Sequence, residues 1–160
     1  MTSTEPTAEL LPMPTGYGTV EATMSWQAVR AKLAAAKQYW FAANRSGGRS
    51  PHLVPLDGLW LADRWYHGGS PETLHRRLVA KNPNVTMHLP HAWDVVIVEG
   101  VVQTLQVSPE EAQRLADAFE AKYPEYGKSE AKLWERPHAL LPRKVLAWSE
   151  FPKDTTRFVF

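Results

Sequence analysis

The stretch WYHGGSPETLHRRLVAKNP, residues 65–83, brings together residue types that can hold a phosphate group. Ser70 is a good N-cap and Pro71 is preset for a first helical turn, so a helix is expected to begin there. The free N–H groups and partial positive charge of that helix start would face the preceding turn, where Gly68 and Gly69 let the backbone approach a ligand. This order of strand, glycine turn and helix predicts an anion-binding turn.

The helix expected over residues 71–81 adds cationic side chains to this turn. A rotation of roughly 100° per residue places Arg76, Thr73 and Arg77 on one arc, so that a hydroxyl lies between two guanidinium groups. The alternative is an ordinary amphipathic helix whose apolar side chains face the core and whose arginines are solvated. Those apolar side chains are Leu74, Leu78 and Val79. The segment by itself leaves both interpretations open.

A second cluster, HLPHAWD at residues 88–94, has the spacing of metal ligands. His88, His91 and Asp94 form its H-x-x-H-x-x-D pattern, but no further ligand signature accompanies them and the segment crosses a proline turn. Metal sites usually have more ligands and supporting hydrogen-bond partners, so we expect no metal here. A serine hydrolase is not expected either, because the chain has no G-x-S-x-G elbow.

The composition favours one soluble domain. The 160 residues are 44% hydrophobic and 11% aromatic, which is enough for a single core. A formal net charge of +1 gives no broad basic surface, so neither nucleic acid nor a membrane is expected as a partner. The chain has no cysteine, which excludes disulfides and thiolate metal sites. We expect a cytoplasmic protein, because no apolar stretch approaches the roughly 20 residues of a membrane span and the N-terminal residues lack a signal-peptide pattern.

The elements that must position the glycine turn begin with an arm and a helix. Residues 1–24 are rich in Thr, Pro and Glu and predict an extended N-terminal arm, followed by a single domain over residues 25–160. Ser25 is the expected N-cap of an alanine-rich helix that continues to about Lys37. Ser108 begins another helix through the pattern Ser-Pro-Glu-Glu.

The remaining elements are expected to be strands. Aromatic and branched residues separated by Gly and Asp breaks indicate consecutive antiparallel strands. Pro51 and Pro55 predict an edge strand, because proline donates no hydrogen bond to a ladder. Gly100, inside the long segment WDVVIVEGVVQTLQV, predicts a bulge. Six or seven strands with about three helices and no βαβ alternation predict a mainly β fold, an antiparallel barrel with peripheral helices.

Several motifs, in this order, resemble the pyridoxamine 5′-phosphate oxidase-like family of flavin-binding split barrels, especially its actinobacterial flavin and deazaflavin oxidoreductase branches. The similarity runs from Trp26 to Gly100 through YWFAANRSGGRSPHLVPLDGLW, HGGSPET, NPNV and DVVIVEG, and resumes in KVLAWSEFPKDTTRF. It implies a split β-barrel of the FMN-binding type and a homodimer whose active sites lie at the subunit interface. It also implies FMN, or alternatively a deazaflavin, as the cofactor.

The resemblance further implies which residues bind that cofactor. The flavin ring is expected against one strand, whose residues are Pro51, His52, Leu53, Val54 and Pro55. The phosphate is expected at the turn and helix that follow, where the matching residues are His67, Gly68, Gly69, Ser70, Thr73 and Arg77. His75 takes a position usually held by lysine or another polar residue. The flavin ring itself performs the redox chemistry in such sites, so no catalytic side chain is nominated.

Two further residues are candidates for closing the pocket from the partner subunit. Trp148 would stack on the ligand, and Arg157 would contact an anion. The alternatives are a core tryptophan and a surface arginine.

Two departures from the family pattern bear on the phosphate. Leu74 stands where the family commonly has arginine, and Leu78 where it commonly has asparagine. The loss of an ionic hydrogen bond would weaken binding by about 1.5–3 kcal/mol, or roughly ten- to a hundredfold. Arg76 is the residue that could compensate, because it lies near Thr73 on the helix.

Two functions follow as hypotheses. The first is a flavin- or deazaflavin-dependent oxidoreductase that acts on an unknown small molecule. The second is a non-catalytic dimeric module of the same fold, which binds a cofactor or another planar ligand.

Overall fold

A computed structural model describes residues 5–160 of the chain. Within this range nine strands form one antiparallel sheet, with three α-helices and two 3₁₀-helices around it. The strands are β1 (Thr7–Leu10), β2 (Tyr39–Ala43), β3 (His52–Leu56), β4 (Gly58–Leu61), β5 (Arg64–His67), β6 (Asn84–His88), β7 (Val95–Thr104), β8 (His138–Trp148) and β9 (Thr156–Val159). The helices are α1 (Trp26–Ala35), α2 (Leu74–Lys81), α3 (Pro109–Lys122), η1 (Pro124–Tyr126) and η2 (Ala131–Trp134).

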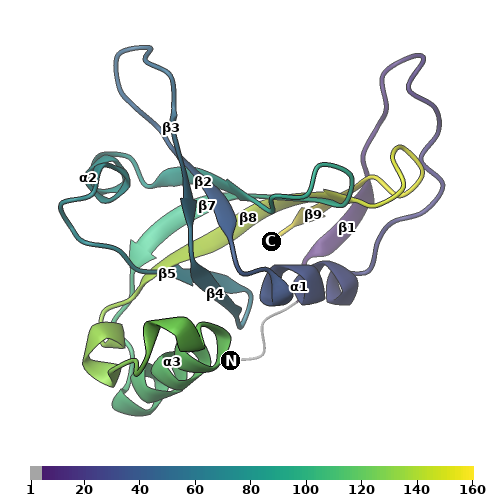
Figure 1. Ribbon diagram of the computed structural model, residues 1–160. Coiled ribbons are helices and arrows are strands. Elements are labelled where there is room, and N and C mark those ends of the chain that lie inside the picture. Colours follow the sequence, from purple (N-terminus) through teal and green to yellow (C-terminus); the bar gives the residue numbers. More distant parts are fainter. Residues whose placement is uncertain (1–4) are drawn as a thin grey trace.

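The sheet curls round without closing, as Figure 1 shows. Its main path runs β1-β9-β8-β7-β6-β2-β3, and the β4–β5 hairpin joins it where β5 pairs with β8. This is the mainly β, antiparallel split barrel with peripheral helices that the sequence predicts. The strand count is higher than the expected six or seven, because Asp57 alone separates β3 from β4 and because β1 lies within the expected arm.

The segment expected as an N-terminal arm contributes a strand to the sheet. β1 pairs along its whole length with β9, the last strand of the chain. The pairing brings Glu9 to Arg157, with 2.6 Å between the carboxylate Oε2 and the guanidinium Nη2. Residues 7–10 are therefore held by a backbone ladder and by an ion pair.

The two longer helices begin where their caps predict. The Ser25 hydroxyl accepts a hydrogen bond from the Ala28 N–H at 3.2 Å, and the Ser108 hydroxyl accepts one from the Glu111 N–H at 3.2 Å. α1 buries a stripe of three residues, which are Trp26, Val29 and Leu33. Each of these predicted helices is confirmed because its capping signal and its apolar stripe agree.

Two sheet features follow from single residue types. β3 lies at one end of the strand order, which confirms the edge position that Pro51 and Pro55 predict. The β7–β8 register shifts between Glu99 and Gly100, which confirms the bulge. A Cβ atom on Gly100 would lie 2.2 Å from the carbonyl oxygen of Leu141, so the close approach of the two strands requires glycine there.

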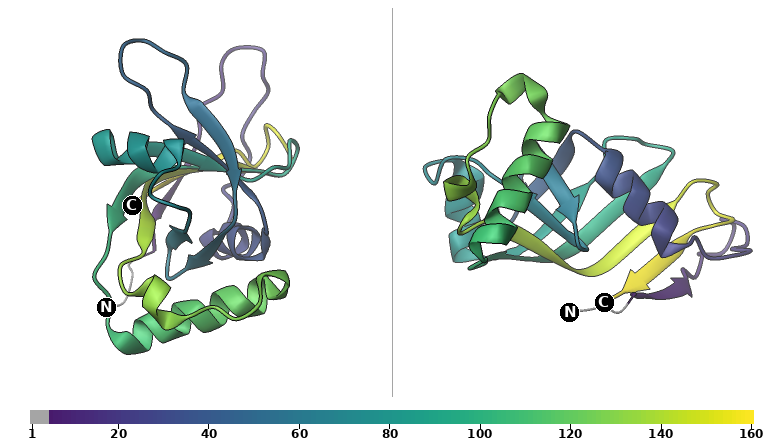
Figure 2. Two further views of the ribbon diagram at one scale, coloured as in Figure 1. Left: turned by 60° about the vertical axis from the view of Figure 1, so that its left-hand side comes forward. Right: turned by 90° about the horizontal axis from the view of Figure 1, so that it is seen from below.

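The core has two parts. The larger fills the barrel and includes Tyr39, Phe41 and Trp65, all of which are fully buried. The smaller lies between α3 and the β4–β5–β8 region, where Leu115 and Trp134 are buried. In Figure 1, α2 lies above β5 and α3 below it, and the left view of Figure 2 again shows the two helices apart, α2 at the upper left and α3 at the bottom. No helix in the described range is long and apolar enough to cross a membrane.

Candidate functional site

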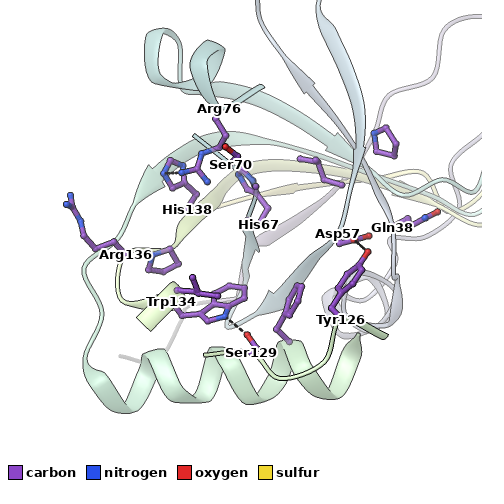
Figure 3. A pocket seen from close by; sticks show the side chains of 17 residues that line it. Gln38, Asp57, His67, Ser70, Arg76, Tyr126, Ser129, Trp134, Arg136 and His138 are labelled. Carbon is purple, nitrogen blue, oxygen red and sulfur yellow. Dashed lines mark hydrogen bonds between the residues drawn. The ribbon is translucent and has the colours of Figure 1, made fainter. Parts of the chain in front are cut away.

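A cavity of about 820 Å³ opens between α2, α3 and the strands β3 and β5 (Figure 3). Its volume is within the range of roughly 300–1,000 Å³ that small-molecule and cofactor sites occupy. The lining residues are Gln38, Pro55, Leu56, Asp57, His67, Gly68, Gly69, Ser70, Arg76, Phe119, Tyr126, Ser129, Leu133, Trp134, Arg136, Pro137 and His138. The expected cofactor turn is therefore one wall of the cavity.

The turn itself differs from the one that the sequence predicts. Ser70 is not the N-cap of α2, which begins at Leu74 with Thr73 in the capping position. The Thr73 hydroxyl donates to the Ser70 carbonyl at 2.8 Å, and the Ser70 hydroxyl accepts from the Glu72 N–H at 3.3 Å. These bonds close a separate turn over residues 70–73, so the helix starts three residues later than expected.

The two glycines leave room above this turn. Gly69 has a φ of +105°, a conformation that residues with a side chain rarely adopt. A Cβ atom on Gly68 would meet no atom within 4 Å, so the backbone there faces open space. The turn can thus present its backbone to a ligand in the cavity.

The side chains of α2 also point in directions that differ from the helical arrangement expected from the sequence. His75 and Val79 are buried, whereas Leu74 is 36% exposed. With this face turned inward, Arg76 lines the cavity and Arg77 is exposed outside it. One of the two expected cations therefore faces the cavity.

Arg76 makes its hydrogen bond to a histidine at the start of β8. Its Nη2 donates to Nε2 of His138 at 2.8 Å, and the Thr104 hydroxyl lies 3.1 Å from the same nitrogen. Arg76 forms no ion pair with a carboxylate in the described part of the chain, and burial lowers its pKa. A partly buried guanidinium without a carboxylate is suited to an anionic ligand.

His67 forms the floor of the cavity between these groups. It is 2% exposed and stacks on Trp65 with ring centroids 4.8 Å apart and planes 21° apart. Neither of its ring nitrogens has a hydrogen-bond partner of normal geometry within residues 5–160. Its ring centroid lies 6.0 Å from that of His138 and 6.1 Å from that of His75.

The pKa values of the three histidines are all lowered. Burial, followed by the charges of His138, His75 and Arg76, lowers the pKa of His67 to about 3. Burial and then Arg76 and His75 lower the pKa of His138 to about 4, and burial and then Arg76 lower that of His75. Arg76 is thus the charged group among them near neutral pH.

The wall opposite the turn is aromatic, and sequence reasoning did not identify it. Phe119, Tyr126 and Trp134 supply it from α3, η1 and η2. The Tyr126 hydroxyl donates to Oδ2 of Asp57 at 2.5 Å, and the Trp134 Nε1–H donates to the Ser129 hydroxyl at 3.0 Å. The sequence signal for this wall was the presence of aromatic residues in and after the PEYGK loop, because aromatic side chains in a loop usually pack against another part of the protein.

The other expected cofactor residues lie outside the cavity lining. On and beside β3 these are Pro51, His52, Leu53 and Val54, and on or near α2 they are Thr73, His75 and Arg77. Trp148 packs edge-on against Phe151 at 5.9 Å. Arg157 forms an ion pair with Glu9 of β1.

The H-x-x-H-x-x-D segment is occupied by local contacts. Asp94 forms an ion pair with Lys32. Burial raises the pKa of Asp94, but the hydrogen bonds from Lys32 and Ser149 lower it by more, so the net pKa is lowered. Nδ1 of His91 accepts from the backbone N–H groups of Trp93 and Asp94. Among residues 5–160 no group of three His, Cys, Asp or Glu side chains is arranged to hold a metal ion.

Comparisons with known proteins bear on the fold. No protein-family model and no curated protein matches the chain. Among solved structures, a FAD-binding protein from Mesorhizobium loti is 17% identical with a TM-score of 0.59, over 86% of this chain and 96% of that one. A candidate pyridoxamine 5′-phosphate oxidase from Listeria innocua is 13% identical with a TM-score of 0.60, over 78% and 98%. An F420 reductase is 18% identical with a TM-score of 0.54, over 83% and 98%. At these identities the likeness shows the split-barrel fold.

Proposed function

We propose that this chain binds a flavin-type cofactor, either FMN or a deazaflavin, and acts as an oxidoreductase on a small molecule. The observation that carries the proposal is the convergence of expected cofactor residues on one cavity. These six are Pro55, His67, Gly68, Gly69, Ser70 and Arg76. The similar solved structures, which include a FAD-binding protein and an F420 reductase, support the same class of ligand.

The residues present fit the phosphate end of such a cofactor. Arg76 supplies a partly buried positive charge that has no carboxylate partner within residues 5–160. The open backbone at Gly68 and the Ser70 hydroxyl lie on the same cavity wall. Arg76 thus takes the role that the absent cation at Leu74 would otherwise have.

The protein's part in the reaction is to bind, orient and exclude water. When bound, the flavin-type ring supplies hydride or electron transfer. His67 and His138 give the cavity a neutral floor, and Phe119 and Trp134 give it an apolar side. Of the two arginines that line the cavity, Arg76 is partly buried and Arg136 is exposed, so the anionic group of the cofactor is assigned to Arg76.

We also propose a homodimer, in which Trp148 and Arg157 of each subunit approach the site of the other. The free edge at β3, where Leu53 is 53% exposed, supports a partner at that side. Light scattering of the purified protein tests the dimer, and a clean monomer would count against a shared site.

A non-catalytic binding module is the second candidate. It is favoured by Leu74, which is exposed at the position where a cation is expected, and by the lowered pKa of His67, which keeps the cavity floor neutral near pH 7. Turnover of any reducing-cofactor couple would reject it.

The two adjacent arginines of α2 provide the test of the cofactor site. Titration of the purified chain with FMN and with a deazaflavin, followed by visible absorption, gives the affinity of each. Arg76→Gln is expected to weaken the tighter ligand roughly ten- to a hundredfold, the loss of one ionic hydrogen bond. Arg77→Gln is the matched control, because Arg77 neighbours Arg76 but is exposed outside the cavity, and it should change affinity less than about twofold.

Two results would overturn the proposal. One is a chain that carries no flavin-like absorption and binds neither compound. The other is an equal loss of affinity in both variants, which would mean that the cation facing the cavity is not the one that holds the ligand.

A further inference from the structure

His138, the first residue of β8, lies between two strands at the end of the cavity where Arg76 is found. In the sheet register it is opposite His67 of β5 on one side and Thr104 of β7 on the other. Figure 3 shows its side chain grouped with those of His67, Ser70 and Arg76, all of which line the cavity. An imidazole and a guanidinium, two groups that can carry positive charge, therefore meet at the same end of the cavity.

The hydrogen bond between these two groups fixes where the imidazole holds its proton. A guanidinium is only a donor, so the 2.8 Å contact from Nη2 of Arg76 requires an unprotonated Nε2 on His138. The Thr104 hydroxyl lies 3.1 Å from the same nitrogen. The ring is then neutral with its proton on Nδ1, which is buried and has no hydrogen-bond partner within residues 5–160. Nε2 can take a proton only after Arg76 turns away from it.

The titratable groups that face His138 are basic. Arg76 and His75 come from α2 and His67 comes from β5, whereas β7 presents an uncharged hydroxyl. Arg136, two residues earlier in the chain, points away from this group in Figure 3. No carboxylate is in an ion pair with Arg76 or His138 in the described part of the chain. Burial, Arg76 and His75 lower the pKa of His138 to about 4, so it is neutral near pH 7 while no ligand is bound.

We infer that His138 is a second contact for the phosphate of the ligand, beside Arg76, and that it takes up a proton from solvent when the phosphate binds. An ionised phosphate oxygen is a stronger acceptor for a guanidinium than a neutral imidazole is, so Arg76 turns to the phosphate and releases Nε2. The negative charge then favours the protonated imidazole, whose new N–H donates to another phosphate oxygen. The inference rests on the proposed function, because the phosphate is taken to be that of the flavin-type cofactor.

Proton uptake at His138 makes the affinity for such an anion depend on pH. The bound state holds a proton that the free state does not, so binding must tighten as the pH falls. If the anion returns the pKa of His138 from about 4 to its ordinary 6.5, affinity rises roughly tenfold between pH 8 and pH 5.5. Inorganic sulfate is the suitable probe, because it stays a dianion over this range, whereas a phosphate monoester itself gains a proton at about pH 6.

NMR titration of the histidine ring protons in the full chain measures proton uptake at the residue itself. Spectra are recorded from pH 8 to pH 5 with no ligand, with sulfate, with FMN, and with riboflavin, which is the same ring without the phosphate. We expect sulfate and FMN each to raise the pKa of His138 by at least about one unit, and riboflavin to leave it unchanged. His91, an exposed loop histidine outside the cavity, is the internal control and should titrate alike in all four samples.

A variant separates the charge of His138 from its hydrogen bond. His138→Gln keeps an acceptor for Arg76 but cannot gain a proton, so its sulfate affinity, measured by calorimetry, should lose the roughly tenfold rise between pH 8 and pH 5.5. His91→Asn removes a histidine away from the cavity and should keep that rise. The NMR titration of the natural chain needs no variant, so it tests the inference even if His138→Gln does not fold.

The outcomes separate this inference from the proposed function. If FMN binds and His138 titrates as it does without ligand, His138 only positions Arg76, and the inference is overturned while the proposed function stands. A pH-dependent rise in sulfate affinity that survives His138→Gln also overturns it, because another group then takes up the proton. If FMN fails to bind but sulfate raises the pKa of His138, the proposed function is overturned and the anion contact stands.

Discussion

The buried histidine at the cavity floor makes stability depend on pH in a direction that can be measured. His67 has an ordinary pKa of 6.5, which the folded protein lowers to about 3. The unfolded chain therefore binds a proton that the folded chain does not. This contribution to stability is fully present above pH 6.5 and is lost as the pH falls toward 3.

The magnitude follows from these two pKa values. Between pH 7 and pH 5 the His67 contribution falls by about 2 kcal/mol, because the unfolded form is mostly protonated at pH 5 while the folded form remains neutral. The pKa values of His138 and His75 are lowered too, so these residues add to the loss of stability in the same direction. Most carboxylates stay ionised in this window, which separates their effect from that of the histidines.

His67→Phe isolates the contribution of this one residue. A phenyl ring can keep the stack on Trp65 and the contact with Phe41, whose centroid lies 5.2 Å from that of His67. It also removes two buried nitrogens that have no partner of normal geometry within residues 5–160, so the variant should be about as stable as the natural chain at pH 7, or more stable. Its loss of stability between pH 7 and pH 5 should be smaller by about 2 kcal/mol.

Urea unfolding at pH 7, 6 and 5, followed by the fluorescence of the seven tryptophans, gives the free energies of unfolding. His91→Asn is the matched control, because it removes an exposed loop histidine. Its stability should depend on pH in the same way as that of the natural chain. The reasoning is refuted if His67→Phe and the natural chain lose the same free energy between pH 7 and pH 5.

Three further predictions concern the backbone and the caps. Gly100→Ala should lower the free energy of unfolding by at least about 2 kcal/mol in urea titrations, because its Cβ would lie 2.2 Å from the Leu141 carbonyl oxygen; an unchanged midpoint would contradict the bulge geometry. Ala62→Gly should increase the free energy of unfolding by about 0.5–1 kcal/mol and so raise the thermal midpoint, because Ala62 has a φ of +50°. A lower thermal midpoint in this variant would contradict the strained backbone at Ala62. Ser108→Ala should cost about 1 kcal/mol in urea titrations by removing the α3 cap, and a smaller effect in Ser108→Asn than in Ser108→Ala would distinguish capping from other causes.

The reach of sequence reasoning is clearest in the elements with local signals. Ser25 and Ser108 mark helix starts because a serine hydroxyl satisfies a backbone N–H three residues away, within one turn. Pro51, Pro55 and Gly100 mark the edge strand and the bulge because each restricts or frees its own backbone. At these positions residues close together in the sequence decide the local structure, so the sequence alone is enough to predict it.

The glycine turn shows where local reasoning ends. Ser70, Pro71 and the two glycines predict a turn that faces a ligand, and the structure has a cavity there. The start of the helix was nevertheless misplaced by three residues, because the Thr73 hydroxyl and N–H both bond to the Ser70 carbonyl and form a turn of their own. Two competing hydrogen-bond patterns of similar length cannot be ranked from residue types alone.

The sequence by itself determined the mainly β fold, the capped helices, the edge strand and the position of the glycine turn. The tertiary structure decided which side chains face the cavity. Burial of His75 and Val79 set the rotation of α2, and that rotation directed Arg76, not Arg77, toward His138. Trp134 and His138 reach the cavity from more than fifty residues along the chain, because α3 must bury its apolar face against β4, β5 and β8. Such contacts depend on how whole faces pack, so no local pattern in the sequence specifies them.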